Sequence, residues 1–172
     1  MMEDFKNKIA VVTGGGTGMG RELVLQLAHD GCHVSMCDVI EENMQETFDI
    51  ATKQYPNVTI TKHKCDVSSE EDVIRFKDEV LEQQDTNHVN LLFNNAGIGG
   101  GGSFIHSSRE EWEKCFAVCW YGVYYCSRAF MPSIIASEEA HIINTSSING
   151  FWASLGGTPH TSYSAAKFAV KG

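Results

Sequence analysis

The sequence has no block of basic residues and no long apolar run, and each absence excludes a class of protein. Its formal net charge is -9, whereas a nucleic-acid surface needs clustered Lys and Arg, so we expect no nucleic-acid partner. No apolar run approaches the roughly 18–20 residues of a membrane helix, and the first residues lack the apolar core of a signal peptide. We therefore expect a soluble, cytoplasmic protein that does not bind membranes.

A closely spaced cysteine pair is also lacking. The chain has six cysteines but no C-x-x-C motif, and without export a disulfide framework is not expected. We predict buried, reduced thiols that act as small hydrophobic groups. Zinc at Cys115 and Cys119 is the alternative, but no second ligand pair follows at a usual spacing, so we expect no metal.

What the sequence does contain is an alternation of short apolar runs and longer amphipathic segments over its 172 residues. Apolar runs such as Ile9–Val12 indicate strands buried on both faces. We predict strands at 9–12, 33–37, 58–64, 90–94 and 141–145, and helices at 19–29, 41–54, 69–84, 108–131 and from 162 onward. This pattern predicts one α/β domain over residues 1–172, a Rossmann-type, doubly wound parallel sheet in three α/β/α layers.

Several residues mark the expected ends of these helices. Gly31 is the expected stop of the first helix, and Pro132 is expected to break the long one. Capping boxes are predicted at Ser68 to Glu71 and from Ser107 onward.

A glycine-rich loop separates the first strand from the first helix. Glycines allow a tight turn and a close approach of backbone amides to a pyrophosphate, and the helix N-terminus adds unpaired N–H donors. A plain flexible turn is the alternative, but strand, loop and helix come in the required order. The candidate cofactor-binding residues here are Gly14, Gly16, Thr17, Gly18, Met19 and Gly20.

Asp38 ends the second strand, where an acid can accept hydrogen bonds from an adenosine ribose. A carboxylate there repels a 2′-phosphate, and neither Val39 nor Ile40 supplies a compensating cation. We therefore favour NAD over NADP. A cap for the helix at 41–54 is the alternative role for Asp38.

Four features in order resemble the short-chain dehydrogenase/reductase family. They are Thr13–Gly20, Asp66-Val67 after the third strand, Asn94–Gly97 after the fourth, and Ser146-Ser147 followed by a Tyr163-x-x-x-Lys167 motif. The resemblance implies an NAD-dependent oxidoreductase that transfers a hydride between the cofactor and an alcohol or carbonyl substrate.

The resemblance also implies roles for matching residues. Asp66 and Val67 would contact the adenine, and Asn94, Ala96 and Gly97 would form the floor under the nicotinamide ribose. Ser147 would bind the substrate oxygen, Tyr163 would be the general acid/base, and Lys167 would hold the ribose.

The chemistry of the last pair can be argued without the resemblance. Tyr163 and Lys167 are four residues apart, so they share one helix face, where a cation favours the ionised phenol. A surface Tyr/Lys pair is the alternative.

Two features depart from the family. Cys119 occupies a position where the family usually has an asparagine that supports a proton relay, and a thiol is a weaker hydrogen-bonding group. The sequence also stops at Gly172, so the resemblance implies that C-terminal strands, the segment over the nicotinamide and most of the substrate lid are missing.

The remaining expectations concern partners. The resemblance suggests a homodimer or homotetramer through the helices at 108–131 and 162–172. Phe151, Trp152 and Leu155 could line a pocket for an apolar secondary alcohol or ketone, or could simply pack the loop. The competing functions are a non-catalytic nucleotide-binding module or an inactive dehydrogenase fragment; serine hydrolysis at Ser147 is disfavoured because no G-x-S-x-G elbow is present.

Overall fold

The computed structural model describes residues 4–100, 102–152 and 159–172. Its sheet has five strands: β1 (Ile9–Thr13), β2 (His33–Asp38), β3 (Ile60–Lys64), β4 (Leu91–Asn94) and β5 (His141–Asn144). Their order is β3-β2-β1-β4-β5, and every neighbouring pair is parallel. The predicted Rossmann-type parallel sheet is therefore confirmed, although β3 begins two residues later than expected.

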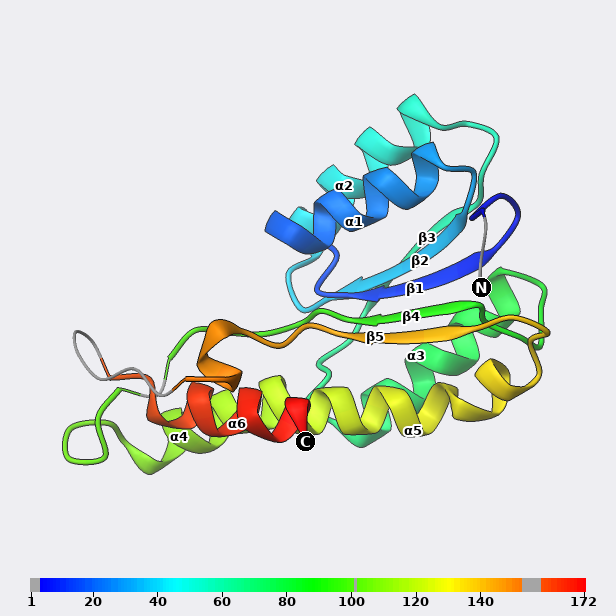
Figure 1. Ribbon diagram of the computed structural model, residues 1–172. Helices are drawn as coiled ribbons and strands as arrows, with labels where there is room; N and C mark the ends of the chain where they lie inside the picture. The colour runs from blue at the N-terminus through cyan, green and yellow to red at the C-terminus, as the bar shows by residue number, and fades with distance from the viewer. Residues whose placement is uncertain (1–3, 101, 153–158) are drawn as a thin grey trace.

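Helices pack on both faces of this sheet. They are α1 (Gly18–His29), α2 (Glu41–Gln54), α3 (Glu70–Gln83), α4 (Arg109–Phe116), α5 (Gly122–Ile135) and α6 (Thr161–Lys171). α1 and α2 cover one face, and α3 and α5 cover the other (Figure 1). α4 and α6 pack against each other beyond the carboxyl ends of the strands, in the lower left of Figure 1. The molecule thus has the three layers that the sequence predicted.

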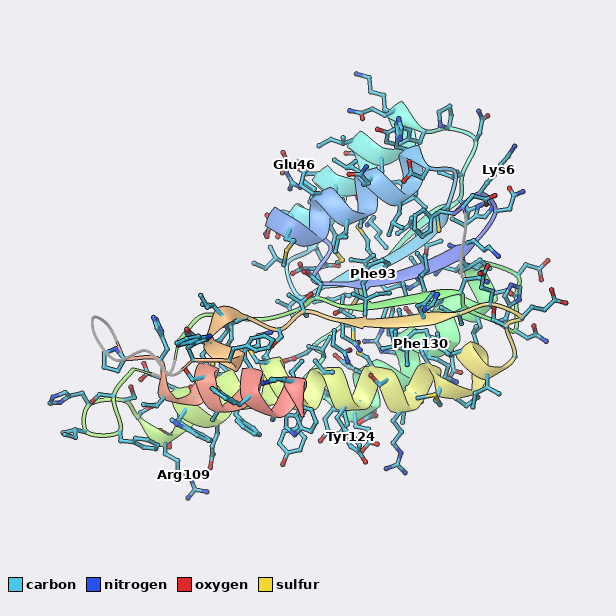
Figure 2. All side chains as sticks on the ribbon, in the orientation of Figure 1. Lys6, Glu46, Phe93, Arg109, Tyr124 and Phe130 are labelled. Atoms are coloured by element: carbon cyan, nitrogen blue, oxygen red, sulfur yellow. The ribbon has the colours of Figure 1, made fainter. Side chains whose placement is uncertain are left out.

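β1, the central strand, shows why helices pack on both faces of the sheet. β1 is buried at every position, with Val11 facing one core and Val12 the other. Figure 2 shows Phe93 on the α1 side of the sheet and Phe130 on the α5 side. Strands covered on both faces need continuous apolar sequence, which is what Ile9–Val12 provides.

β5 differs from β1 because it forms an edge of the sheet. It is largely exposed, and Ile143, on the α1 side, keeps 36% of its surface accessible.

No helix among the described residues is long and apolar enough to cross a membrane.

Two of the predicted helix signals are confirmed. Gly31 follows α1 with φ +82°, a left-handed conformation that glycine adopts without strain. Ser108 and Glu111 form a full capping box at the start of α4.

The cap of α3 lies one residue later than predicted. The Ser69 side chain accepts a hydrogen bond from the Asp72 amide, so Ser69 is the N-cap. The Asp72 carboxylate reaches the amide of Asp66 rather than that of the cap residue. The Ser69 cap and the bond to Asp66 together fix the first turn of α3.

The expected break at Pro132 was wrong. α5 continues through Pro132 to Ile135. A proline in a helix leaves the carbonyl four residues earlier without its usual donor. That residue is Arg128, which lies on the exposed side of α5, and the helix continues for three residues beyond the proline.

The predicted helix over 108–131 is also interrupted. A π-helical turn at Ala117–Tyr121 separates α4 from α5. Such single turns are often found at functional sites. This one contains Cys119, the residue at the family's asparagine position.

Candidate active site

The glycine loop folds tightly against the start of α1. A Cβ atom added to Gly20 would lie 1.9 Å from the Gly14 carbonyl oxygen, so only glycine fits this position. Gly18, the first residue of α1, has φ +53°, and no atom lies within 4 Å of where its Cβ would be. The first turn of α1 also carries no acidic side chain. Open space in front of unpaired helix amides suits an anion such as a pyrophosphate.

Asp38 lies directly beside this loop. Its Oδ2 accepts a hydrogen bond from the Gly16 amide at 3.1 Å, and its Oδ1 accepts one from the Ile40 amide at 3.1 Å. α2 begins after Ile40, and no side chain caps it. The carboxylate therefore joins the glycine loop to the end of β2 instead of capping the helix in the usual way.

Asp66 and Val67 follow β3 at the same end of the sheet. Asp66 is exposed, and its Oδ1 accepts hydrogen bonds from the Ser68 amide at 2.9 Å and the Ser68 hydroxyl at 2.6 Å. The Asp66 amide donates to Asp72 Oδ2 at 3.1 Å, and this bond is the main reason that the pKa of Asp72 is lowered. Val67 is buried against Gly122, where an added Cβ would lie 2.7 Å from a Val67 methyl group.

Asn94 holds several elements together. It is 2% exposed, and its Nδ2 donates to Ser127 Oγ at 2.9 Å and to Asn144 Oδ1 at 2.8 Å. Those partners come from α5 and β5. Its side-chain amide group thus joins β4 to its neighbours.

The turn after Asn94 is fixed by Thr13, which the sequence analysis placed at the start of the glycine motif without assigning it a role in this turn. The Thr13 hydroxyl accepts hydrogen bonds from the amides of Asn95 and Ala96, each at 3.0 Å. Asn95 Nδ2 in turn donates to the Thr13 carbonyl at 3.1 Å. The end of β1 therefore sets the position of the Asn94–Gly97 segment. A hydroxyl at the end of the strand before the glycine loop is the signal that could have revealed this.

The three candidate catalytic residues come from the segment after β5 and from α6. Ser147 is the N-cap of a 3₁₀ turn (Ile148–Gly150), and its Oγ accepts from the Asn149 amide at 3.2 Å. This turn packs on α6, since a Cβ on Gly150 would lie 2.7 Å from the Lys167 carbonyl oxygen. The structure thus brings the Ser147 segment against the helix that carries Tyr163 and Lys167.

Lys167 is an unusual lysine because it is only 2% exposed. Its Nζ donates to the Thr145 carbonyl oxygen at 2.7 Å and lies 5.6 Å from the centroid of the Tyr163 ring. Burial lowers the pKa of Lys167. The predicted sharing of one helix face by Tyr163 and Lys167 is confirmed.

Cys119 lies close to this lysine. A Cβ added to Gly97 would be 3.7 Å from Cys119 Sγ and 3.8 Å from Lys167 Nζ, so both side chains end near Gly97. The Cys119 thiol donates to the Ile98 carbonyl at 3.4 Å, and Cys115 Sγ lies 3.8 Å from the same oxygen. Burial raises the pKa of Cys119, which keeps it a thiol.

The aromatic residues expected to line a substrate pocket lie at the surface. Phe151 is 56% exposed and Trp152 is 74% exposed, directly after the turn that Ser147 begins. Leu155 lies outside the described residues. Among the described residues, no group of three or more His, Cys, Asp or Glu side chains could hold a metal ion.

The glycine loop, Asp38, the turn after β4 and the Tyr163–Lys167 helix all gather at the carboxyl ends of the strands. The chain matches the family model described as short chain dehydrogenase over residues 8–172 and belongs to that family.

Individual relatives agree with this assignment. A short-chain dehydrogenase/reductase of Burkholderia phymatum, solved in complex with NAD, is 35% identical with a TM-score of 0.88, covering 99% of this chain and 58% of that one. A metagenomic short-chain oxidoreductase in complex with NADP is 28% identical with a TM-score of 0.85, covering 97% of this chain and 73% of that one. Epidermal retinol dehydrogenase 2 of Mus musculus is 33% identical over 165 residues, 96% of this chain and 52% of its own length. The chain spans between half and two thirds of the length of the curated relatives that it matches.

Proposed function

We propose that this chain carries the cofactor site and the acid/base pair of an NAD(H)-dependent oxidoreductase that interconverts an alcohol and a carbonyl group. The observation that carries the proposal is the buried Lys167 ammonium beside the Tyr163 ring, at the same end of the sheet as the glycine loop. Burying a cation costs free energy, so a buried lysine at the end of the sheet that binds ligands is a candidate functional residue.

The residues at this end of the sheet fit a dinucleotide. The open space before Gly18 and the free amides of α1 would hold the pyrophosphate, and Asp38 would bind the adenosine ribose. Asp66 and Val67 would lie at the adenine, and Ala96 and Gly97 at the nicotinamide ribose. Bound NAD⁺ would supply the hydride acceptor.

The chain's own residues would handle the proton. Ser147 Oγ would hold the substrate oxygen, and Tyr163 Oη would take the hydroxyl proton during oxidation and return it during reduction. The charge of Lys167 favours the ionised phenol, which makes Tyr163 a better base. A positioned acid/base of this kind typically contributes about 10²–10⁴-fold to the rate.

NAD is favoured over NADP because of Asp38. The carboxylate lies next to the Gly16 amide, and its negative charge would repel a 2′-phosphate at the adenosine ribose. Asp38→Ser removes this charge, so the ratio of NADPH to NADH affinity should rise in that variant. An unchanged ratio would argue against the role of Asp38.

The test of catalysis is Tyr163→Phe with Tyr124→Phe as a matched control. Tyr124 lies on α5 with 40% of its surface exposed, and Figure 2 shows it pointing away from the sheet. Over a panel of apolar secondary alcohols and ketones, Tyr163→Phe should lower turnover by at least about 10²-fold, with NADH affinity kept. Tyr124→Phe should match the parent. Undiminished turnover in Tyr163→Phe would contradict the proposal.

An apolar substrate is proposed because Phe151 and Trp152 stand exposed beside the segment that carries Ser147. Association of copies through α4, α5 and α6 is proposed because the π-helical turn between α4 and α5 exposes Tyr121, α5 exposes Met131 and α6 exposes Phe168. Sedimentation of the chain at several concentrations tests the second point, since a monomer at all of them would contradict it.

The second candidate function is a non-catalytic nucleotide-binding module, favoured by a thiol at position 119 in place of the family's amide. It predicts that the parent chain binds NADH but turns over no member of the substrate panel.

A further inference from the structure

The carbonyl oxygen of Gly16 is held by two side chains from different helices. Arg21, in α1, donates to it from Nε at 3.1 Å and from Nη2 at 2.8 Å. Thr47, in α2 and fully buried, has its hydroxyl 2.9 Å from this oxygen and 3.1 Å from the Asn43 carbonyl oxygen of its own helix, so Gly16 is the nearer acceptor for the single hydroxyl proton. The two side chains also contact each other, because Arg21 Nε lies 3.0 Å from Thr47 Oγ1. One glycine carbonyl thus has two side chains holding it.

This arrangement fixes the direction of the next amide. The described chain has no cis peptide bond, and in a trans peptide the C=O and N–H groups point to opposite sides. Holding the Gly16 oxygen toward α2 therefore turns the Thr17 N–H away from Arg21 and Thr47. Within the described part of the chain, the Thr17 amide donates to no acceptor. It precedes Gly18, where open space lies before the helix.

The guanidinium of Arg21 is itself held on its outer side. Its Nη2 lies 2.6 Å from Glu46 Oε2, and Glu46 is 61% exposed. Figure 2 shows Glu46 on the outside of the α1–α2 layer. The Arg21 guanidinium already contacts Gly16, Thr47 and Glu46. Any effect of Arg21 on ligand binding should therefore come from the orientation that it gives to the peptide between Gly16 and Thr17.

We propose that Arg21 and Thr47 are positioning residues for the cofactor's pyrophosphate, acting by aiming the Thr17 amide at it. The inference rests on the proposed NAD(H) function. It assigns a role in cofactor affinity to a buried threonine of α2 that lies outside the glycine motif. A direct role for the positive charge of Arg21 is the competing explanation, and Thr47 separates the two because it carries no charge.

The test uses Arg21→Met and Thr47→Val in the 172-residue chain, with Thr52→Val as the matched control. Thr52 also lies in α2, but its hydroxyl donates only within the helix, to the Phe48 carbonyl at 2.7 Å. NADH and adenosine are titrated in parallel, and circular dichroism and thermal unfolding report whether each variant keeps the fold. Adenosine lacks the phosphates, so its affinity reports only on the part of the site that would bind the adenine and its ribose.

We expect NADH affinity to fall about tenfold in Arg21→Met and about five- to tenfold in Thr47→Val, the effect of losing a well-placed hydrogen bond. Adenosine affinity should stay the same in both variants, and Thr52→Val should bind both ligands like the parent. If Arg21→Met loses the fold, Thr47→Val decides the matter.

Three results would overturn the inference. The first is unchanged NADH affinity in Thr47→Val, which would leave only the charge of Arg21. The second is an equal loss of adenosine affinity, which would indicate general disorder of the site. The third is a parent chain that binds adenosine but not NADH, which would remove the proposed function together with this inference.

Discussion

Replacing Thr13 by valine tests the account of how β1 positions the turn after β4. Valine keeps the shape of the side chain but removes the hydroxyl that accepts from the Asn95 and Ala96 amides, each at 3.0 Å. Thr13 is 2% exposed, so water cannot easily take the place of the hydroxyl. The Asn95 amide keeps the Phe93 carbonyl as an acceptor at 3.0 Å, so the Ala96 amide is the donor left without one, which should cost about 1–3 kcal/mol.

Urea unfolding followed by far-UV circular dichroism measures this cost. Thr13→Ser is the control, because it keeps the oxygen and loses only a methyl group; its cost should be about 1 kcal/mol or less. The slope of the free energy of unfolding against urea concentration should be the same for the parent, Thr13→Val and Thr13→Ser. A Thr13→Val chain within about 0.5 kcal/mol of the parent would refute the reasoning, since surface changes without structural consequence have that size.

Three further predictions follow from single sites. Burial lowers the pKa of His63 from its ordinary value of 6.5, so the folded state binds this proton more weakly than the unfolded chain does. Stability from this residue is thus present above that value and is lost as the pH falls through 6.5 and below. In His63→Gln, the urea midpoint should therefore change less with pH in this acidic range. Cys119→Asn should leave turnover unchanged or raise it, because an amide is a stronger hydrogen-bonding group than a thiol; a large fall with NADH affinity intact would be the contrary result. Ser108→Ala removes the capping box with Glu111 and should cost about 1 kcal/mol in thermal or urea unfolding, whereas no change would show that the cap is dispensable.

Much of the fold could be predicted because its signals are local. Ile9–Val12 is apolar at every position, and Gly31 stops a helix through its own backbone conformation. The glycine loop, Asp38 and the Tyr163–Lys167 pair were placed correctly at the carboxyl ends of the strands because parallel strands all end at the same edge.

The parts that the sequence did not reveal depend on long-range contacts. The Thr13 hydroxyl serves amides more than eighty residues away, and Thr47 reaches Gly16 across 31 positions. Asn94 matched the family pattern, yet its amide joins strands and a helix that only the fold brings together. The apolar residues around Cys119 keep ordinary helical spacing in the sequence, so periodicity could not reveal the π-helical turn there.

The central claim is that this chain binds NAD(H) through the glycine loop and Asp38, and calorimetric titration with NADH and, in parallel, NADPH tests it most directly. The account predicts measurable NADH binding and weaker NADPH binding by the folded 172-residue chain. A folded chain that binds neither dinucleotide, or that prefers NADPH, would contradict it.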